Sequence, residues 1–285
     1  MTRIEKTIFK FYGALAIGLI LLSVFLYIEL LPQDLKFYVL NIGQGDAIFI
    51  RTPSGYNILI DGGPDNFVVY KLGQYLPFYD RQIDLMILTH PDADHLVGLV
   101  EVLRRYQVKA ILLTGTMNNS PPYQEFLKII EDKNPRIVIA GRVKDIGIEP
   151  NLDLQILYPF ESIADKTLKE TNDYSVVAKL NYANFSVLLT GDAPEGIENK
   201  LMKAKANIDA DVLKIAHHGS SASSGNDFLA GVKPKLAVIS VGQNKFGHPS
   251  PEVLVRLDEQ NIPYFTTLDK GDIIVYSDGQ KFWLK

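Results

Sequence analysis

Four side chains that can bind a metal ion lie within six residues, 90–95, which read His-Pro-Asp-Ala-Asp-His. The spacing turns His90 and Asp92 toward one point, and Asp94 and His95 toward a second point beside it. Either aspartate alone would be an ordinary helix cap. Four such groups so close together repel and desolvate one another unless a cation is present. The segment therefore predicts a site for a divalent metal ion.

The placement of the other histidines supports this prediction. The chain has five histidines, and all of them fall in three short motifs. Residues 90–95 contain two of them, and the others are His217, His218 and His248. Since the chain has no cysteine, imidazole and carboxylate groups must hold the metal.

Short apolar strands position these polar groups. Residues 83–89 form an apolar run typical of a buried strand, and residues 96–106 place apolar side chains on one helical face. The hexapeptide thus lies on a strand-to-helix loop, where open α/β sheets place their chemistry. Three further predicted strands, 185–190, 212–216 and 236–240, lead in the same way to Asp192, His217-His218 and His248. This regularity predicts one shared cleft.

The rest of the globular part alternates between strands and helices. Glycine-rich turns separate its first strands, which predicts an antiparallel start to a sheet at 36–42, 47–50 and 57–60. Asp46 and Asp61 follow two of these strands and are expected to support the site, with a turn aspartate as the alternative for each. Beyond the hexapeptide we expect a helix at 123–132 and strands at 110–113, 137–140, 154–158 and 175–181.

Composition sets the broad class of the protein. The chain has 285 residues, 47% hydrophobic and 22% charged, enough for one large globular domain with a sizeable core. Its net charge of −4 argues against nonspecific electrostatic binding over the whole surface, as in histone-like proteins, and leaves room for a local basic groove.

Residues 11–28 form an uncharged apolar stretch. As a helix it would be about 27 Å long, close to the hydrocarbon thickness of a bilayer. We therefore expect residues 1–33 to be a cytoplasmic N-terminus with an uncleaved transmembrane helix, and residues 34–285 to be the globular domain. A buried core helix and a cleaved signal peptide are the alternatives.

Most of the positive charges near that stretch precede it. Arg3, Lys6 and Lys10 lie before it, whereas Glu29, Asp34 and a single Lys36 follow it. The positive-inside rule then predicts a single-pass membrane protein whose globular domain lies outside the cytoplasm.

Six motifs of this chain occur together in one known family. They are Ile42–Asp46, Ile60–Gly63, Thr89–His95, Leu189–Asp192, Leu213–Ser220 and Gly247–Pro249. In this respect the chain resembles the metallo-β-lactamase fold superfamily, and most closely the C-terminal hydrolase domain of the ComEC/Rec2 DNA-uptake family. The resemblance runs from about residue 36 to residue 285. The channel and the oligonucleotide-binding region of that family have no counterpart here, so we do not expect DNA transport itself.

The resemblance implies an α/β fold: an αββα sandwich of the metallo-β-lactamase type, preceded by one transmembrane helix, with a metal cleft at the edge between its sheets. The superfamily signature His-x-His-x-Asp-His appears here with Asp92 in place of its second histidine. By position, Asp192 would be the bridging carboxylate. His217 or His218 would be the last ligand of the site that Asp94 and His95 begin.

The middle histidine of the superfamily has no counterpart in this chain. Asn172 and Ser175 stand there instead and are candidate catalytic residues, together with Asp94. The half of the site that holds His90 and Asp92 is therefore rich in oxygen. This implies one or two divalent ions, either Mn²⁺ or Zn²⁺, with Mg²⁺ as a further candidate.

Together these features predict an enzyme, a metal-dependent phosphodiesterase or nuclease acting on DNA outside the membrane. Gly219, Ser220 and Ser221 offer donors for a phosphate cradle, with a solvated loop as the alternative. His248 precedes a helix capped by Ser250 and is expected to act as an acid or substrate clamp, with a structural role as the alternative.

Two other functions compete with this prediction. One is hydrolysis of another phosphoester, such as a phosphocholine or cell-envelope ester. The other is a catalytically degenerate, membrane-tethered binding module, which the missing histidine favours. The hexapeptide and the Gly-His-Pro motif argue against a β-lactamase. The sequence leaves the substrate, the oligomeric state and any association with a separate DNA-uptake channel open.

Overall fold

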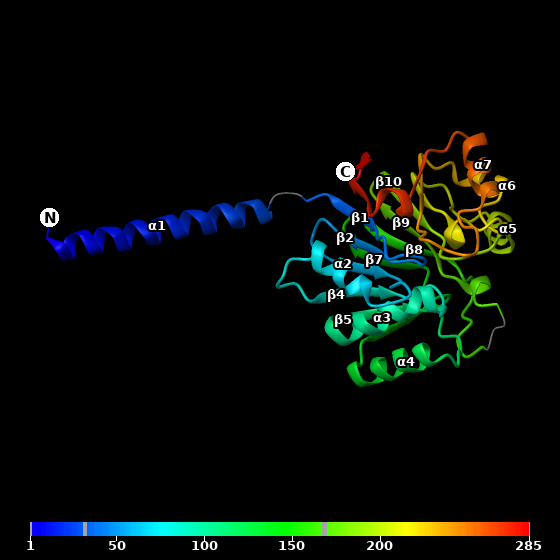
Figure 1. Ribbon diagram of the computed structural model, residues 1–285, viewed down its shortest axis with the longest axis horizontal. Coiled ribbons are helices and arrows are strands. Elements are labelled where there is room, and N and C mark those ends of the chain that lie inside the picture. The colour runs from blue at the N-terminus through cyan, green and yellow to red at the C-terminus, as the bar shows by residue number, and fades with distance from the viewer. Residues whose placement is uncertain (1, 31–32, 167–169, 285) are drawn as a thin grey trace. The chain divides into compact units, whose positions relative to one another are not determined.

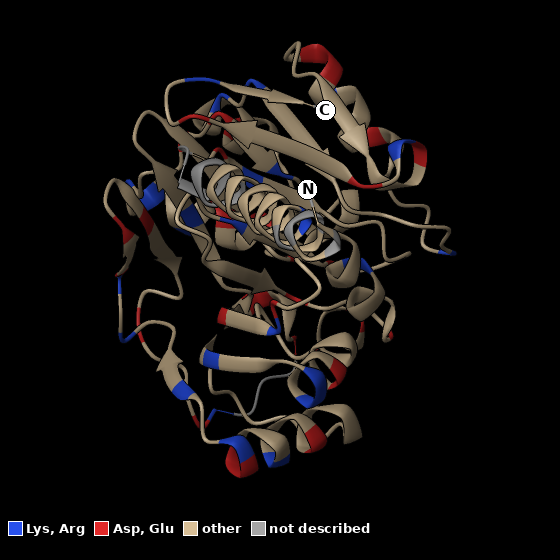
Figure 2. Ribbon diagram, turned by 90° about the vertical axis from the view of Figure 1, so that its left-hand side faces the viewer, with Lys and Arg blue, Asp and Glu red and all other residues tan. Residues whose placement is uncertain are grey.

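The computed structural model describes residues 2–30, 33–166 and 170–284. The chain divides into two compact units, residues 1–33 and 34–285. The first unit contains the helix α1 (Arg3–Leu30), which is free of charged residues over most of its length (Figure 2). Within the described residues, no helix combines the length and the apolar character that crossing a membrane requires. The predicted transmembrane anchor, and with it the predicted single-pass orientation, is therefore not supported.

The second unit contains two sheets within the described residues, and the first has eight strands. In spatial order these strands are β15 (Phe282–Leu284), β14 (Ile273–Ser277), β1 (Leu35–Val39), β2 (Ile48–Arg51), β3 (Asn57–Ile60), β4 (Gln82–Ile87), β5 (Gln107–Leu113) and β6 (Arg136–Ile139). Strands β1, β2 and β3 pair antiparallel, as the glycine-rich turns predicted. From β3 to β6 the pairing is parallel, so β4 and its neighbours end at the same edge of the sheet.

The second sheet has seven strands and a similar change of direction. In spatial order they are β13 (Tyr264–Thr266), β12 (Leu236–Ile239), β11 (Val212–Lys214), β10 (Phe185–Leu189), β9 (Val177–Tyr182), β8 (Leu152–Tyr158) and β7 (Asp145–Glu149). Strands β10 to β13 are parallel, whereas β7 to β10 pair antiparallel. Strands β10, β11 and β12 therefore send their following loops to one edge.

Helices cover the outer face of each sheet (Figure 1). The first sheet packs against α2 (Phe67–Tyr75), α3 (Ala93–Arg105) and α4 (Pro121–Lys133) through one apolar cluster. The second sheet packs against α5 (Glu195–Lys203), α6 (Asn226–Val232) and α7 (Pro251–Glu259) through another. The short elements η1 (Asn172–Tyr174), η2 (Ala216–Gly219) and α8 (Thr267–Lys270) lie in connecting segments. This arrangement confirms the predicted αββα sandwich.

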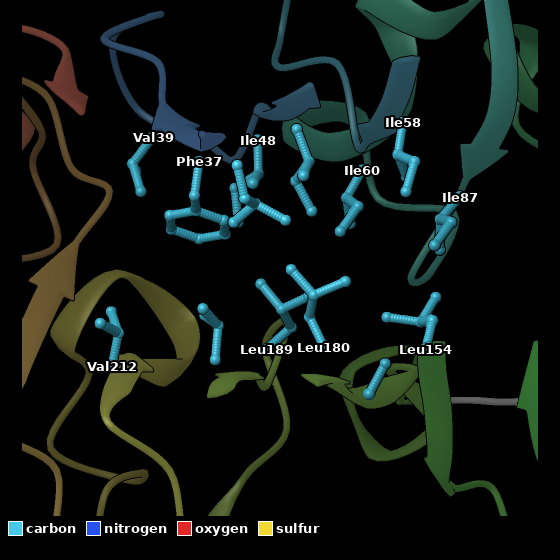
Figure 3. Packing of buried hydrophobic residues seen from close by; sticks show 14 of the residues in the cluster. Phe37, Val39, Ile48, Ile58, Ile60, Ile87, Leu154, Leu180, Leu189 and Val212 are labelled. Atoms are coloured by element: carbon cyan, nitrogen blue, oxygen red, sulfur yellow. The ribbon is translucent and has the colours of Figure 1, made fainter. Parts of the chain in front are cut away.

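A third apolar cluster fills the space between the sheets. In Figure 3, Phe37 and Ile60 from the first sheet face Leu180 and Val212 from the second. In β1, alternate side chains point to opposite faces: Phe37 joins this inner cluster, and Tyr38 joins the outer one. Burial of each such side chain is worth about 1.5–3 kcal/mol, so this core fixes how the two sheets face each other.

Glycines bring the loops at the shared edge into backbone contact. A Cβ atom added to Gly45 would lie 2.2 Å from the carbonyl oxygen of Asp94, and one added to Gly98 would lie 1.9 Å from the carbonyl oxygen of Gly62. The approach at Gly45 allows the backbone N–H of Asp46 to donate to the Asp94 carbonyl at 3.1 Å. The loop before β2 is thereby held against the start of α3.

Candidate metal centre

The ends of strands from both sheets bring the predicted site residues together. His90 follows β4, and His95 lies in the first turn of α3. Asp192 follows β10, and His218 lies in η2 directly after β11. Ligand atoms within 4.8 Å of one another occur in four groups: His90 with His95 and Asp192, Asp94 with His95 and His218, Asp46 with Asp61 and His95, and Asp46 with Asp192 and His218. The strand ends therefore bring these side chains around one centre, as their positions in the sequence predicted.

Asp192 lies at the centre of these groups. Its Oδ2 atom is 3.3 Å from Nε2 of His95 and 3.5 Å from Nε2 of His218. The same oxygen is 3.8 Å from Nε2 of His217 and 3.9 Å from Nε2 of His90. One carboxylate thus faces four imidazoles, which is the placement expected for a bridging ligand.

The opposite nitrogen of each buried imidazole is held by the protein. Nδ1 of His95 lies 2.8 Å from Oδ2 of Asp61, and Nδ1 of His218 lies 2.9 Å from the carbonyl oxygen of Ser240. Both acceptors require the proton on Nδ1, which leaves a lone pair on Nε2. This tautomer is the one that binds a metal through Nε2.

Thr89 extends the same support to His90. Its backbone N–H and its hydroxyl donate to the two carboxylate oxygens of Asp61, at 2.8 and 2.7 Å. Because its hydroxyl proton is used in that bond, the Thr89 oxygen, 2.9 Å from Nδ1 of His90, is an acceptor for that nitrogen. Ser175 Oγ lies 3.3 Å from the same Nδ1 and accepts from the Asp192 N–H at 3.2 Å. Asp61 and Ser175 therefore orient ligand candidates.

Several buried atoms that face the centre lack a hydrogen-bond partner among the described residues. They are Nε2 of His90, His95 and His218, and Oδ1 of Asp192. A buried polar atom without a partner costs about 1–3 kcal/mol, so four together are unfavourable unless something binds them. Three nitrogen lone pairs and a carboxylate are a suitable donor set for a divalent metal ion.

The charges around the centre favour a cation. Burial by itself would lower the pKa of His95, but the carboxylates of Asp192 and Asp61 outweigh it and hold that pKa well above its ordinary value. In the same way Asp192, Asp46 and Asp94 overcome burial and raise the pKa of His218 to about 10. The carboxylates thus favour a second proton, on Nε2 of these imidazoles, when no metal is bound; a bound metal would displace that proton and supply its positive charge instead.

Asp46 forms a buried ion pair with a lysine beside the site. Its Oδ2 atom lies 2.9 Å from Nζ of Lys214, and both side chains are almost fully buried. Its Oδ1 atom lies 3.3 Å from Nδ1 of His218. Although burial opposes ionisation, Lys214 and His218 hold the pKa of Asp46 below its usual range. Asp46 therefore supports the site indirectly: it contacts the His218 ring on the side that faces away from the centre.

The site has a closed side and an open side. We call His90, His95, Asp192 and His218 the buried cluster; their side chains are at most 4% exposed. We call Asp92, Asp94, His217 and His248 the open rim, of which the first three side chains are 37%, 36% and 31% exposed.

Within the rim, each aspartate approaches one histidine of the cluster. Asp92 Oδ2 lies 3.7 Å from Nε2 of His90, and Asp94 Oδ2 lies 3.3 Å from Nε2 of His218. Asp92 stands at the N-cap of α3 but makes no side-chain capping bond; its other oxygen accepts from the Thr171 hydroxyl. Each aspartate could therefore add a carboxylate oxygen to an ion held by the cluster.

Residues 219–221 follow the histidine pair, but not all of their donors are free. The Ser220 N–H donates to the His217 carbonyl at 2.9 Å, and the Ser220 hydroxyl oxygen accepts from Ala222. Ser221 is exposed, and its carbonyl accepts from Arg256. Gly219 is the last residue of the 3-10 helix η2, so a phosphate cradle in this segment would depend on the Ser221 N–H group and the two hydroxyls. Asn172, in η1, has a buried Oδ1 atom without a partner among the described residues.

Three supporting residues were not predicted from the sequence: Thr89, Lys214 and Ser240. Lys214 had a visible signal, because it is the one charged residue in the apolar run 212–216. A lysine that is 0% exposed needs a buried partner, and Asp46 supplies it. Ser240 acts through its backbone carbonyl, which no side-chain pattern reveals.

Comparison with known proteins gives a consistent result. The family model of the metallo-beta-lactamase superfamily matches residues 40–243. The chain is 31% identical over 253 residues to ComE operon protein 3 of Bacillus subtilis (strain 168), covering 82% of this chain and 32% of that protein. It is 29% identical over 269 residues to Recombination protein 2 of Haemophilus influenzae, covering 90% and 31%. Competence protein ComA of Neisseria gonorrhoeae is 28% identical over 246 residues, with 84% and 32% covered. The chain spans about a third of the length of these relatives.

Solved structures share the fold at low sequence identity. The metallo-beta-lactamase fold protein YhfI from Bacillus subtilis superimposes with a TM-score of 0.56 at 12% identity, covering 89% of this chain and 100% of that one. A long form RNase Z from yeast gives a TM-score of 0.52 at 12% identity, covering 85% and 42%. At this identity the likeness concerns the fold alone.

Proposed function

The chain belongs to the metallo-beta-lactamase superfamily and is related to competence proteins of the ComEC family, and on this premise we propose that it is a metal-dependent phosphodiesterase that cleaves nucleic acid. The observation that carries the proposal is the buried cluster, whose three unpartnered Nε2 atoms and central carboxylate face a rim open to solvent. The names of the relatives, which refer to competence and recombination, support nucleic acid as the substrate.

His90, His95, His218 and Asp192 would hold the metal ion, and Asp92 and Asp94 would complete its ligands from the rim. A divalent ion bound there lowers the pKa of water and polarises a phosphoryl oxygen. Asp61 fixes the direction of the His95 lone pair, and the Ser240 carbonyl fixes that of His218. The protein thereby presents its donor atoms in advance.

His248 is placed to handle protons or to bind the substrate. Its ring centroid lies 5.4 Å from that of His217, and its Nδ1 atom is buried without a partner among the described residues. Burial, together with His217 and His218, lowers the pKa of His248 below its ordinary value. A neutral imidazole at pH 7 can accept a proton from an attacking water through one nitrogen and donate to a phosphoryl oxygen through the other.

The direct test is hydrolysis by the purified full-length chain. We expect cleavage of DNA phosphodiesters with Mn²⁺, and no opening of a chromogenic cephalosporin with Mn²⁺ or Zn²⁺. The same assays with Zn²⁺ and Mg²⁺ rank the ions. Bound metal without phosphodiester cleavage, but with cleavage of a phosphomonoester or phosphocholine ester, would favour the other hydrolase. Absence of metal binding would favour a binding module.

The variant His248→Ala tests whether His248 acts in catalysis or as a metal ligand. The variant should keep its metal and lose about 10²–10⁴-fold in kcat, the usual effect of removing a positioned acid or base. Gln243→Ala, an exposed change in the same loop, is the matched control and should match the wild type. Full activity of His248→Ala would reduce His248 to a structural residue, and loss of metal would make it a ligand.

A further inference from the structure

An exposed aromatic ring stands at the rim of the candidate metal centre. Phe246 is 64% exposed, yet its ring centroid lies 5.8 Å from that of His248, with an interplanar angle of 31°. The His248 ring contacts His217, whose Nε2 lies 3.8 Å from Asp192 Oδ2. A continuous series of contacts therefore joins the exposed Phe246 ring to the central carboxylate.

The backbone that carries Phe246 is fixed by one side-chain amide. Asn244 donates to the carbonyl oxygens of Gly242 and His248, at 2.9 and 2.7 Å. Its own oxygen accepts from the N–H groups of Phe246 and His248, at 3.0 and 3.1 Å. A ring on a fixed backbone loses little conformational entropy when a ligand stacks on it, so the exposed face is preorganised for contact.

A cation without a carboxylate partner lies beside the ring. Nζ of Lys245 is 5.9 Å from the centroid of Phe246. Within the described part of the chain, Lys245 forms no ion pair with an aspartate or glutamate. The other exposed residues of this loop are Gln243 and Gly247, so Phe246 is the one exposed apolar side chain among residues 243–248 of a polar loop. Such surroundings suit a nucleotide better than an apolar protein surface, because a base needs a π-face and its phosphate needs a cation.

We propose that Phe246 is a stacking platform for the nucleobase next to the scissile phosphate, and that Lys245 pairs with a neighbouring phosphate. The inference rests on the proposed function and narrows its substrate to an unpaired strand. Inside a duplex both faces of a base are covered by its neighbours, whereas an unpaired base can offer one face to Phe246. The metal centre would cut beside the base that the ring holds.

The test compares cleavage beside a base with cleavage beside an abasic residue in one single-stranded oligonucleotide. The full chain with Mn²⁺ should cut both positions, and gel mapping gives a rate for each. Phe246→Ala should lower the rate beside the base by about 5- to 150-fold, the range for loss of one stacked base, and leave the abasic position unchanged. Lys245→Ala should lower both rates, because its phosphate contact does not depend on the base.

Phe246→Trp should restore the rate, since a larger ring also stacks. Phe78→Ala is the matched control, because Phe78 is 87% exposed on the loop between α2 and β4 and contacts Tyr79. Equal losses at the two positions in Phe246→Ala, or no loss at either, would overturn the proposal.

A binding measurement keeps the two proposals apart. A single-stranded oligonucleotide carrying 2-aminopurine, bound by the full chain without added metal, should lose fluorescence through stacking. Phe246→Ala should abolish this quenching and Phe78→Ala should preserve it. Quenching that depends on Phe246 supports the platform even where the wild type cleaves nothing, which would refute only the nuclease. Cleavage by the wild type without such quenching would refute only the platform.

Discussion

The buried cluster and the open rim are built from the same residue types but differ in what surrounds them. In the cluster, the outward nitrogens of His95 and His218 are held by Asp61 and by the Ser240 carbonyl. In the rim, the His217 side chain is 31% exposed, and its Nε2 atom lies 3.8 Å from Oδ2 of Asp192. The difference teaches that residue identity gives the capacity to bind a metal, while the partners behind each ring decide which ring is fixed for it.

Backbone conformation explains why His217 and His218, although adjacent, lie in the open rim and in the buried cluster respectively. His217 and His218 both have left-handed backbone angles, with φ of 50° and 53°. This tight turn sends the His218 ring inward, between Asp46 and Ser240, and leaves the His217 ring at the surface beside His248. We therefore expect the cluster to hold the metal and the rim to act on the substrate.

The largest effect is expected at the centre of the cluster. Asp192→Ala removes the carboxylate that faces four imidazoles, so bound metal and activity should be lost together. The loss of metal affinity should exceed about 100-fold, since residues behind the ligands are already worth about 10- to 100-fold. Metal content measured by mass spectrometry checks this. Asp209→Ala, at a side chain 73% exposed, is the control, and unchanged metal in Asp192→Ala would show that the bridge is misplaced.

The adjacent histidines test the comparison itself. His218→Ala should weaken metal binding by at least about 10-fold, whereas His217→Ala should keep the metal and lose part of the rate. Calorimetric titration with Mn²⁺ and Zn²⁺ measures the first quantity, and DNA cleavage measures the second. If His217→Ala lost the metal and His218→Ala kept it, the division into cluster and rim would be reversed.

The smallest effect is expected at Glu198, a buried acid that contacts the loop following His217 and His218. Glu198 accepts from the N–H groups of Ser224 and Gly225, at 2.6 and 3.0 Å. Burial raises its pKa to about 7; Glu195 adds to the rise, and the two N–H groups and Arg256 oppose it. Because the folded pKa lies above the unfolded one, this contribution to stability is complete below the unfolded pKa and is lost as pH rises through the folded pKa.

Glu198→Gln should remove that dependence. Between pH 5 and pH 8, the wild type should lose about 2 kcal/mol of unfolding free energy relative to the variant. Urea unfolding of both proteins at the two pH values measures the difference. Parallel pH profiles would mean that Glu198 titrates normally in the folded state.

Apolar runs were enough to predict individual strands, and the polar groups at the strand ends predicted a shared site, whereas the sandwich itself was predicted from the family resemblance. The run 83–89 predicted β4 (Gln82–Ile87), and the run 185–190 predicted β10 (Phe185–Leu189). The edge strand β7 escaped prediction because its sequence, Asp-Ile-Gly-Ile-Glu, is short and carries a charge at each end. It becomes a strand because it pairs antiparallel with β8. This pairing is a tertiary contact, which the local sequence of β7 does not reveal.

The candidate site was predictable at the level of segments, and less so at the level of roles. Their common position at strand ends predicted that residues 90–95, Asp192 and the histidine pair would meet, and in the structure their metal-capable side chains lie around one centre. The sequence could not show which of His217 and His218 is the metal ligand, because the two residues are chemically identical and adjacent. The pairing of Asp46 with Lys214 joins positions far apart in the chain, so it required the fold.

One further consequence follows from the origin of the buried cluster. His90 and His95 follow a strand of the first sheet, whereas Asp192 and His218 follow strands of the second. An ion bound by all four would therefore be a non-covalent cross-link between the two halves of the sandwich. Its binding free energy would add to the free energy that holds the sheets together. Chelation should then speed amide exchange even in strands that lie far from any ligand.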